Sequence, residues 1–138
     1  MMSIVFFKRI YLLTLLLGAL LLSGQPALAH HSFAAEFDVA KPVTLAGTVT
    51  ELAWTNPHAH IHIEVVDQRG TTTAWDLELG SPNALKRRGW SMTSLKAGDK
   101  ITVTGYLAKD GSHLANARTV TLADGRTVFA GSSAPDAK

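Results

Sequence analysis

The sequence predicts a small domain made mainly of β-strands, and three observations support this prediction. Several segments rich in Val, Ile, Leu and Thr alternate apolar with polar side chains, as half-buried strands do. Turn residues, often glycine, separate these segments, and residues 81–89 carry the signals of a short helix. Three strands, one helix and two strands follow in that order. This is the element order of an OB-like five-stranded barrel, with a β-sandwich as the alternative.

The first three predicted strands cover residues 43–54, 58–67 and 71–79. We expect Gly47 to mark a bulge or sharp bend in the first of them. Asn56-Pro57 is a turn signal between the first and second strands. Gly70 closes a short loop between the second and third strands, where a left-handed residue is needed.

The loop at residues 68–70 sets the register of the predicted hairpin. Counting back from it places two apolar pairs on the core side and two His–carboxylate pairs on the other side. A slip by one residue would set apolar side chains against carboxylates, so the register is well specified. The expected pairs are Ile63 with Trp75, Ile61 with Leu77, His62 with Asp76, and His60 with Glu78.

The predicted helix lies between the third and fourth strands. Ser81 is a suitable N-cap, Pro82 fits the first helical position, and Gly89 is a suitable C-terminal cap. The last two strands are predicted at 100–106 and 114–122, with 127–130 as a short addition. Closure of the sheet would protect its edges.

The N-terminal residues are typical of a secretory signal peptide. Lys8 and Arg9 precede an apolar run at 10–22, and small residues stand at the cleavage positions of Ala27-Leu28-Ala29. The apolar run is shorter than the roughly 20 residues that cross a bilayer as a helix. We therefore expect cleavage after Ala29, a periplasmic or secreted protein, and no membrane span afterwards.

The remaining chain divides into three predicted parts. An extended N-terminal arm at 30–42 carries Phe33 and Phe37, an apolar patch that could pack on the domain. The β-domain follows at 43–130. The tail at 131–138 is small and polar and is predicted to be disordered.

The composition excludes several classes of site. Loss of Lys8 and Arg9 with the leader leaves 11 basic and 11 acidic side chains, which does not favour a nucleic-acid partner. The absence of cysteine excludes disulfides and thiolate metal sites. There is no Ser-His-Asp spacing, phosphate-binding glycine loop or cysteine nucleophile. We expect a protein that is not an enzyme.

All six histidines follow the predicted cleavage site, and five of them fall in two clusters. His30 and His31 open the mature chain. His58, His60 and His62 share one side of a predicted strand. Neighbouring rings, about 6.6 Å apart along the strand, can converge on one ion, whereas the outer pair, about 13 Å apart, cannot easily do so.

A metal site would therefore combine two of these strand histidines with a further ligand. The candidates are Asp76 or Glu78 across the hairpin, His113, and the N-terminal pair, of which His30 could also offer its α-amine. Nitrogen ligands without sulfur favour Cu(II), followed by Zn(II) or Ni(II). The hypothesis is an extracytoplasmic binding protein that captures a divalent transition metal, with copper favoured.

Two other interpretations of the same residues remain open. Histidines opposite carboxylates are also typical of a solvated strand with cross-strand charge pairs. A periplasmic protein- or saccharide-interaction module would need no metal and would use Trp54 and Trp90 as surface anchors, although packing in the core or at its rim is the favoured interpretation for each tryptophan. The residues alone do not choose among these interpretations.

Four segments together resemble a family of small secreted bacterial proteins of unknown function. The resemblance covers residues 30–131 and implies an extracytoplasmic setting. It brings no activity, cofactor or catalytic residue with it. The segments are HHSFAAEFD, WTNPHAHIHIEV, WDLELGSPNALKRRGW and LKAGDKITVTGYLAKDGSHLANARTVTLADGRTVFAG.

Overall fold

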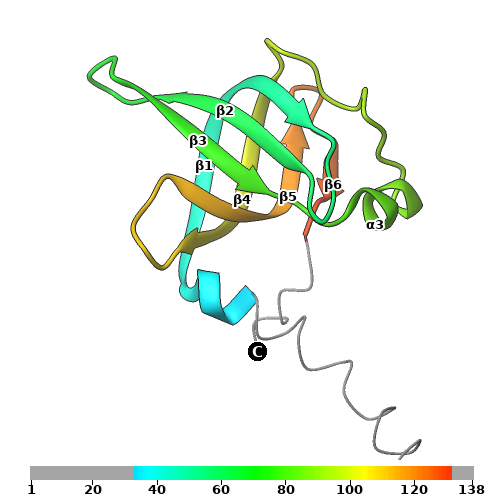
Figure 1. The fold of residues 1–138 in the computed structure, drawn as a ribbon. Coiled ribbons are helices and arrows are strands. Elements are labelled where there is room, and N and C mark those ends of the chain that lie inside the picture. Colours follow the sequence, from blue (N-terminus) through cyan, green and yellow to red (C-terminus); the bar gives the residue numbers. More distant parts are fainter. Residues whose placement is uncertain (1–32, 132–138) are drawn as a thin grey trace, which may run out of the picture.

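The computed structural model describes residues 33–131 (Figure 1). The predicted signal peptide, His30, His31 and the predicted tail from residue 132 lie outside the described residues. The described part is mainly β, as expected. Its elements are β1 (Phe37–Ala53), β2 (His60–Val66), β3 (Thr72–Glu78), α3 (Pro82–Arg87), β4 (Lys100–Ala108), β5 (Leu114–Leu122) and β6 (Thr127–Phe129).

The strands form one six-stranded sheet in the order β3-β2-β1-β4-β5-β6. Neighbours in this order are antiparallel. In addition, β3 pairs in parallel with β5, from Asp76 opposite Leu114 to Glu78 opposite Asn116. This extra pairing brings the start of β5 beside the end of β3.

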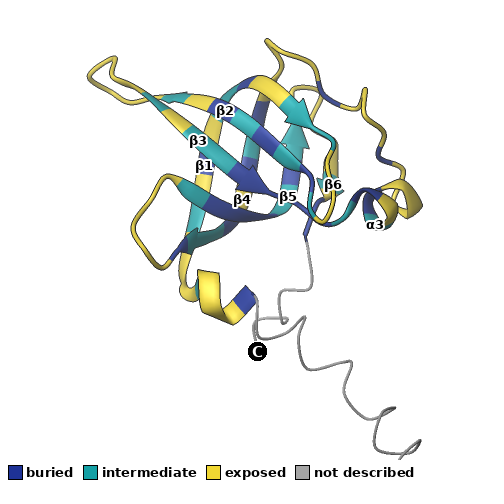
Figure 2. Ribbon diagram, in the orientation of Figure 1, coloured by how far each residue is buried: buried dark blue, intermediate teal, exposed yellow. Residues whose placement is uncertain are grey.

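Buried apolar side chains alternate with exposed ones along the central strands (Figure 2). Ile61, Ile63, Leu77, Val103 and Val120 are among the side chains almost fully removed from solvent. Leu85 and Trp90, from α3 and the segment after it, join the same apolar cluster. The period of two in the sequence therefore produces one main core.

The β2–β3 hairpin has the predicted register. Ile63 pairs with Trp75 and His62 with Asp76, and the other two expected pairs also form. The Asp67 N–H donates to the Thr71 carbonyl at 3.0 Å, and Gly70 has the left-handed φ of 80° that the loop requires. Both predictions are confirmed.

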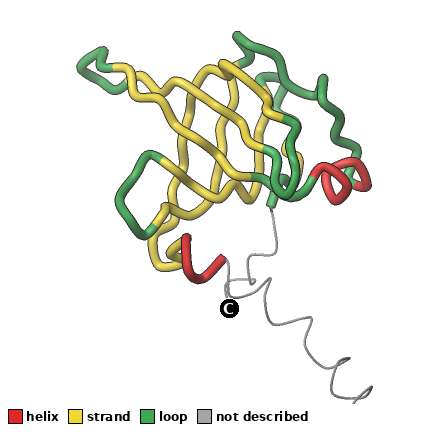
Figure 3. Tube along the Cα trace, viewed as in Figure 1, coloured by secondary structure: helices red, strands yellow, loops and turns green. Residues whose placement is uncertain are grey.

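Strand β1 is longer than predicted, because it begins at Phe37 and not at residue 43. Residues 37–42 therefore belong to the sheet and are not a separate arm; Phe37 pairs with Ala108 of β4. Phe33 and Phe37 are buried in a small cluster with Ala108, which confirms that this apolar patch packs on the domain. The preceding residues, 33–36, make one helical turn at the edge of the molecule (Figure 3).

The irregularity in β1 lies a little after the position predicted from Gly47. Its register against β2 shifts between Val49 and Glu51. Gly47 is needed for a different reason: a Cβ there would lie 2.7 Å from the Glu64 carbonyl oxygen. Close approach of β2 therefore explains this glycine.

Helix α3 has the predicted caps. The Ser81 hydroxyl accepts a hydrogen bond from the Ala84 N–H at 3.3 Å, and Pro82 occupies the first turn. Gly89 follows the C-cap residue with a φ of 88°. Within residues 33–131, no helix is both long and apolar enough to cross a membrane.

Candidate functional site

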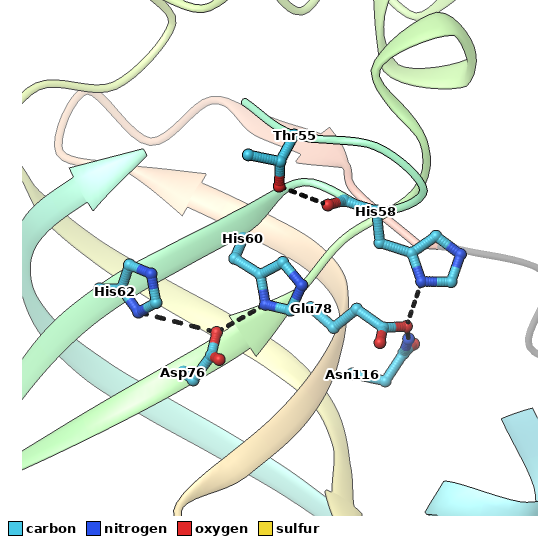
Figure 4. A network of polar contacts seen from close by, with 7 residues as sticks. All are labelled: Thr55, His58, His60, His62, Asp76, Glu78 and Asn116. Carbon is cyan, nitrogen blue, oxygen red and sulfur yellow. Dashed lines mark hydrogen bonds and ion pairs between the residues drawn. The ribbon is translucent and has the colours of Figure 1, made fainter. Parts of the chain in front are cut away.

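Three histidines and two carboxylates gather on one side of the β2–β3 hairpin (Figure 4). His60 and His62 lie on β2, and His58 lies in the loop just before β2. Asp76 and Glu78 lie on β3. We call these five residues the histidine face. The alternate residues of the same stretch, Ala59, Ile61 and Ile63, are buried in the core.

Each imidazole turns its Nδ1 atom toward a carboxylate oxygen. The distances are 3.1 Å from His58 to Glu78, 2.7 Å from His60 to Asp76, and 3.7 Å from His62 to Asp76. The first two are within hydrogen-bond range, and the third is too long. Because a carboxylate accepts the hydrogen bond, a neutral His60 ring carries its proton on Nδ1 and keeps its lone pair on Nε2.

The rings of His60 and His62 lie side by side. Their centroids are 6.4 Å apart and their planes differ by 15°. The two side chains are 28% and 40% exposed, so an ion from solvent can reach them. On the other side of β2, strand β1 places Glu51 opposite His62 in register, a neighbour that the sequence analysis did not identify.

Glu78 is the buried carboxylate of the histidine face, with its side chain 11% exposed. Its Oε1 atom accepts a hydrogen bond from the Nδ2 of Asn116, which is fully buried, at 3.2 Å. Burial raises the pKa of Glu78, and the Glu36 charge adds to this effect, while His58 opposes it. Asn116, Glu78 and His58 thus form a polar chain from the core to the surface.

The backbone near His58 is also held in place, since the Thr55 hydroxyl donates to the His58 carbonyl at 3.0 Å. Asn116 was not identified from the sequence. Its only signal is a polar residue between two alanines in a strand, and its role depends on the β3–β5 pairing.

Two other groups of predicted ligands stand apart from these contacts. His113 is exposed, and its ring packs 5.0 Å from that of Trp75, on the side of β3 opposite Asp76. His30 and His31 are outside the described residues. Among residues 33–131, no three His, Asp or Glu side chains are already gathered as a metal-ligand set. An ion would need ring rotation, or ligands from beyond this part of the chain.

A family model matches residues 19–117, which is most of the chain. The chain belongs to a family of unknown function, DUF6152. The expected resemblance to such a family is confirmed. The DUF6152 match includes the whole histidine face and Asn116, and it ends within β5, before the expected limit at residue 131. No curated protein sequence matches the chain.

The DUF6152 segment also contains the two tryptophans considered as surface anchors. Trp90 instead packs in the core, which is the favoured interpretation: the residue is 5% exposed, and its indole N–H donates to the Phe129 carbonyl at 3.1 Å. Trp54 is partly buried against the same core. Packing of α3 and the following segment onto the sheet explains the placement of Trp90.

Proposed function

We propose that the protein is a non-enzymatic, extracytoplasmic binding protein that captures a divalent transition metal at the histidine face, Cu(II) in preference to Zn(II). One observation carries this proposal: the Nδ1 atoms of His58 and His60 are hydrogen-bonded to carboxylates. Metal-binding histidines characteristically use one ring nitrogen for such a bond and the other for the ion. Ligation by nitrogen without sulfur favours copper.

His60 and His62 are the proposed primary ligands, because their rings are nearly parallel, adjacent and partly exposed. Asp76 orients the ring of His60 through a hydrogen bond and lies near the ring of His62. His58 is the third candidate, and Glu78 holds its ring from the buried side.

Further ligands are proposed from the N-terminal end of the mature chain. Phe33 and Phe37 pack with Leu114, and Leu114 pairs with Asp76 of β3, so the N-terminal part of the described chain lies near the histidine face. His30 and His31 come shortly before Glu36 in the sequence. After cleavage behind Ala29, His30 would add an α-amine to its ring nitrogen.

We also propose that the sheet is an OB-like barrel of five strands, extended by β6. The support is the β3–β5 pairing, which lets β1, β2, β3, β5 and β4 pair in a cycle. The histidine face lies on β2 and β3, a surface that OB barrels use for ligands. The use of this surface by OB barrels agrees with a binding role. A fold does not by itself define a function, so the proposal depends on the residues of the histidine face.

The test is calorimetric titration of the signal-cleaved protein with Cu(II) and Zn(II) near neutral pH, after mass spectrometry has verified its N-terminus. We expect stoichiometric binding that weakens as pH falls through the imidazole range. Replacing both His60 and His62 with alanine should weaken binding by at least about tenfold. The matched control is His113→Ala, which should bind as the wild type does. Absence of stoichiometric binding, or an equal loss in the control, would overturn the proposal.

A further inference from the structure

A second candidate site involves the segment after β3, where basic residues concentrate. Residues 80–98 carry Lys86, Arg87, Arg88 and Lys96 and no acidic side chain. The segment is therefore positively charged, although basic and acidic side chains are equal in number over the predicted mature chain. Such a segment attracts anions.

This positive segment borders a cavity of about 210 Å³ between the α3 connection and the β5–β6 hairpin. Arg88 lines it from the end of α3, and Arg126 lines it from the turn between β5 and β6. Its other walls are largely apolar and include Trp90, Leu95, Leu122 and Val128. Two arginine residues from separate elements thus line a cavity whose other walls include four apolar side chains.

Arg88 is held in place by an aromatic ring. Its guanidinium lies 4.0 Å from the centroid of the Phe129 ring, a cation–π contact. Within the described part of the chain, no carboxylate pairs with Arg88. Its planar set of N–H donors therefore remains available to an anion.

Among the residues that the structure describes, Arg126 has only a local ion-pair partner. Its Nε atom lies 2.7 Å from Asp124, two residues away, and both side chains are exposed to solvent. Exposed ion pairs of this kind contribute little to stability, so a ligand can compete for the guanidinium. Arginine commonly binds carboxylates through two parallel hydrogen bonds.

We propose that this cavity binds a small organic anion of the arylcarboxylate class. The carboxylate would lie between Arg88 and Arg126, and the ring would lie against Trp90 and Leu95. The cavity is smaller than the roughly 300–1,000 Å³ of pockets for drug-sized ligands, which favours a compact molecule. The site shares no residue with the histidine face and needs no metal.

The experiment is an NMR titration of metal-free, isotope-labelled protein with benzoate, which follows the assigned indole N–H of Trp90. Benzyl alcohol supplies the ring without the charge, and acetate supplies the charge without the ring. We expect saturable shifts with benzoate and at least about tenfold weaker binding of both comparison compounds. Absence of saturation, or equal binding of benzyl alcohol, would overturn the proposal. Equal binding of acetate would also overturn it, because the apolar walls would then have no role.

Variants test whether the two arginines form the site. Arg88→Gln and Arg126→Gln should each weaken benzoate binding by about tenfold. Arg87→Gln removes an exposed neighbour that does not line the cavity, so it should bind as the wild type does. All three positions are exposed, and the amide spectra report whether each variant is folded. Unchanged binding in both test variants, or an equal loss in Arg87→Gln, would contradict the assignment.

Discussion

The Nδ1 atom of His60 lies 2.7 Å from Asp76, although the backbone register places His60 opposite Glu78. Glu78 is instead paired with His58, at 3.1 Å. Side chains lean along their strands, and diagonal neighbours across a hairpin are within reach of long side chains. The histidine face therefore consists of two units: a half-buried one at Asp76 and a more deeply buried one at Glu78.

The first prediction concerns Asp76, which orients His60 and lies near His62. Asp76→Asn should lower metal affinity by about 10- to 100-fold, because the ring orientation and the basicity of Nε2 both depend on the carboxylate. Calorimetric titration with Cu(II) or Zn(II) measures the change. Glu64→Gln is the control, since Glu64 is an exposed carboxylate further along β2. If Asp76→Asn bound metal as tightly as Glu64→Gln, Asp76 would have no orienting role.

The second prediction concerns the pH dependence of stability. Burial raises the pKa of Glu78 above its ordinary value of 4.5. At a pH between the ordinary pKa and the raised pKa, the folded protein therefore holds a proton that the unfolded chain releases. The contribution of Glu78 to stability is therefore present at low pH and is lost as pH rises through the raised pKa. Glu78→Gln cannot ionise. Its free energy of unfolding should increase relative to that of the wild type as pH rises.

Urea unfolding between about pH 4 and about pH 8 provides the measurement. Glu64→Gln again serves as the control, since Glu64 is exposed, and its difference from the wild type should change less with pH. A difference for Glu78→Gln that stayed constant or decreased with pH would show that burial does not dominate the ionisation of Glu78.

The third prediction concerns Gly105 in β4. A Cβ at this position would lie 2.0 Å from the carbonyl oxygen of Asn116, so Gly105→Ala must displace the backbone of β5. We expect a loss of about 3 kcal/mol in the free energy of unfolding. Thr102→Ala, on the same strand, should cost about 1 kcal/mol or less. Equal urea midpoints for the two variants would refute the close approach.

The fourth prediction separates a structural Trp90 from a surface anchor. Trp90→Phe keeps an aromatic ring in the core but removes the N–H that donates to the Phe129 carbonyl. This should cost about 1–2 kcal/mol of stability, since the carbonyl loses its partner. Trp54→Phe should cost less, because Trp54 is only partly buried. Unchanged thermal stability of Trp90→Phe would mean that the indole is not part of the core.

Local sequence patterns determine the register of one hairpin and the position of one helix in this protein. The β2–β3 register follows from alternation and from the Gly70 loop, because a slip by one residue would exchange the core side for the solvent side. Helix α3 follows from Ser81 and Pro82, which satisfy and shape its first turn. These features depend only on neighbours along the chain, so the residue order is sufficient to predict them. The common side of His60 and His62 follows in the same way.

Tertiary structure alone decided which groups meet across the fold. The β3–β5 pairing joins residues almost forty positions apart and brings Asn116 to Glu78. Packing of the α3 connection onto the sheet buries Trp90, and the course of β1 along β4 extends that strand back to Phe37. Side-chain lean then selects Asp76 for His60. Each of these contacts depends on burying apolar surface and satisfying polar groups in the whole domain at once. The spacing of residues along the chain does not predict such contacts.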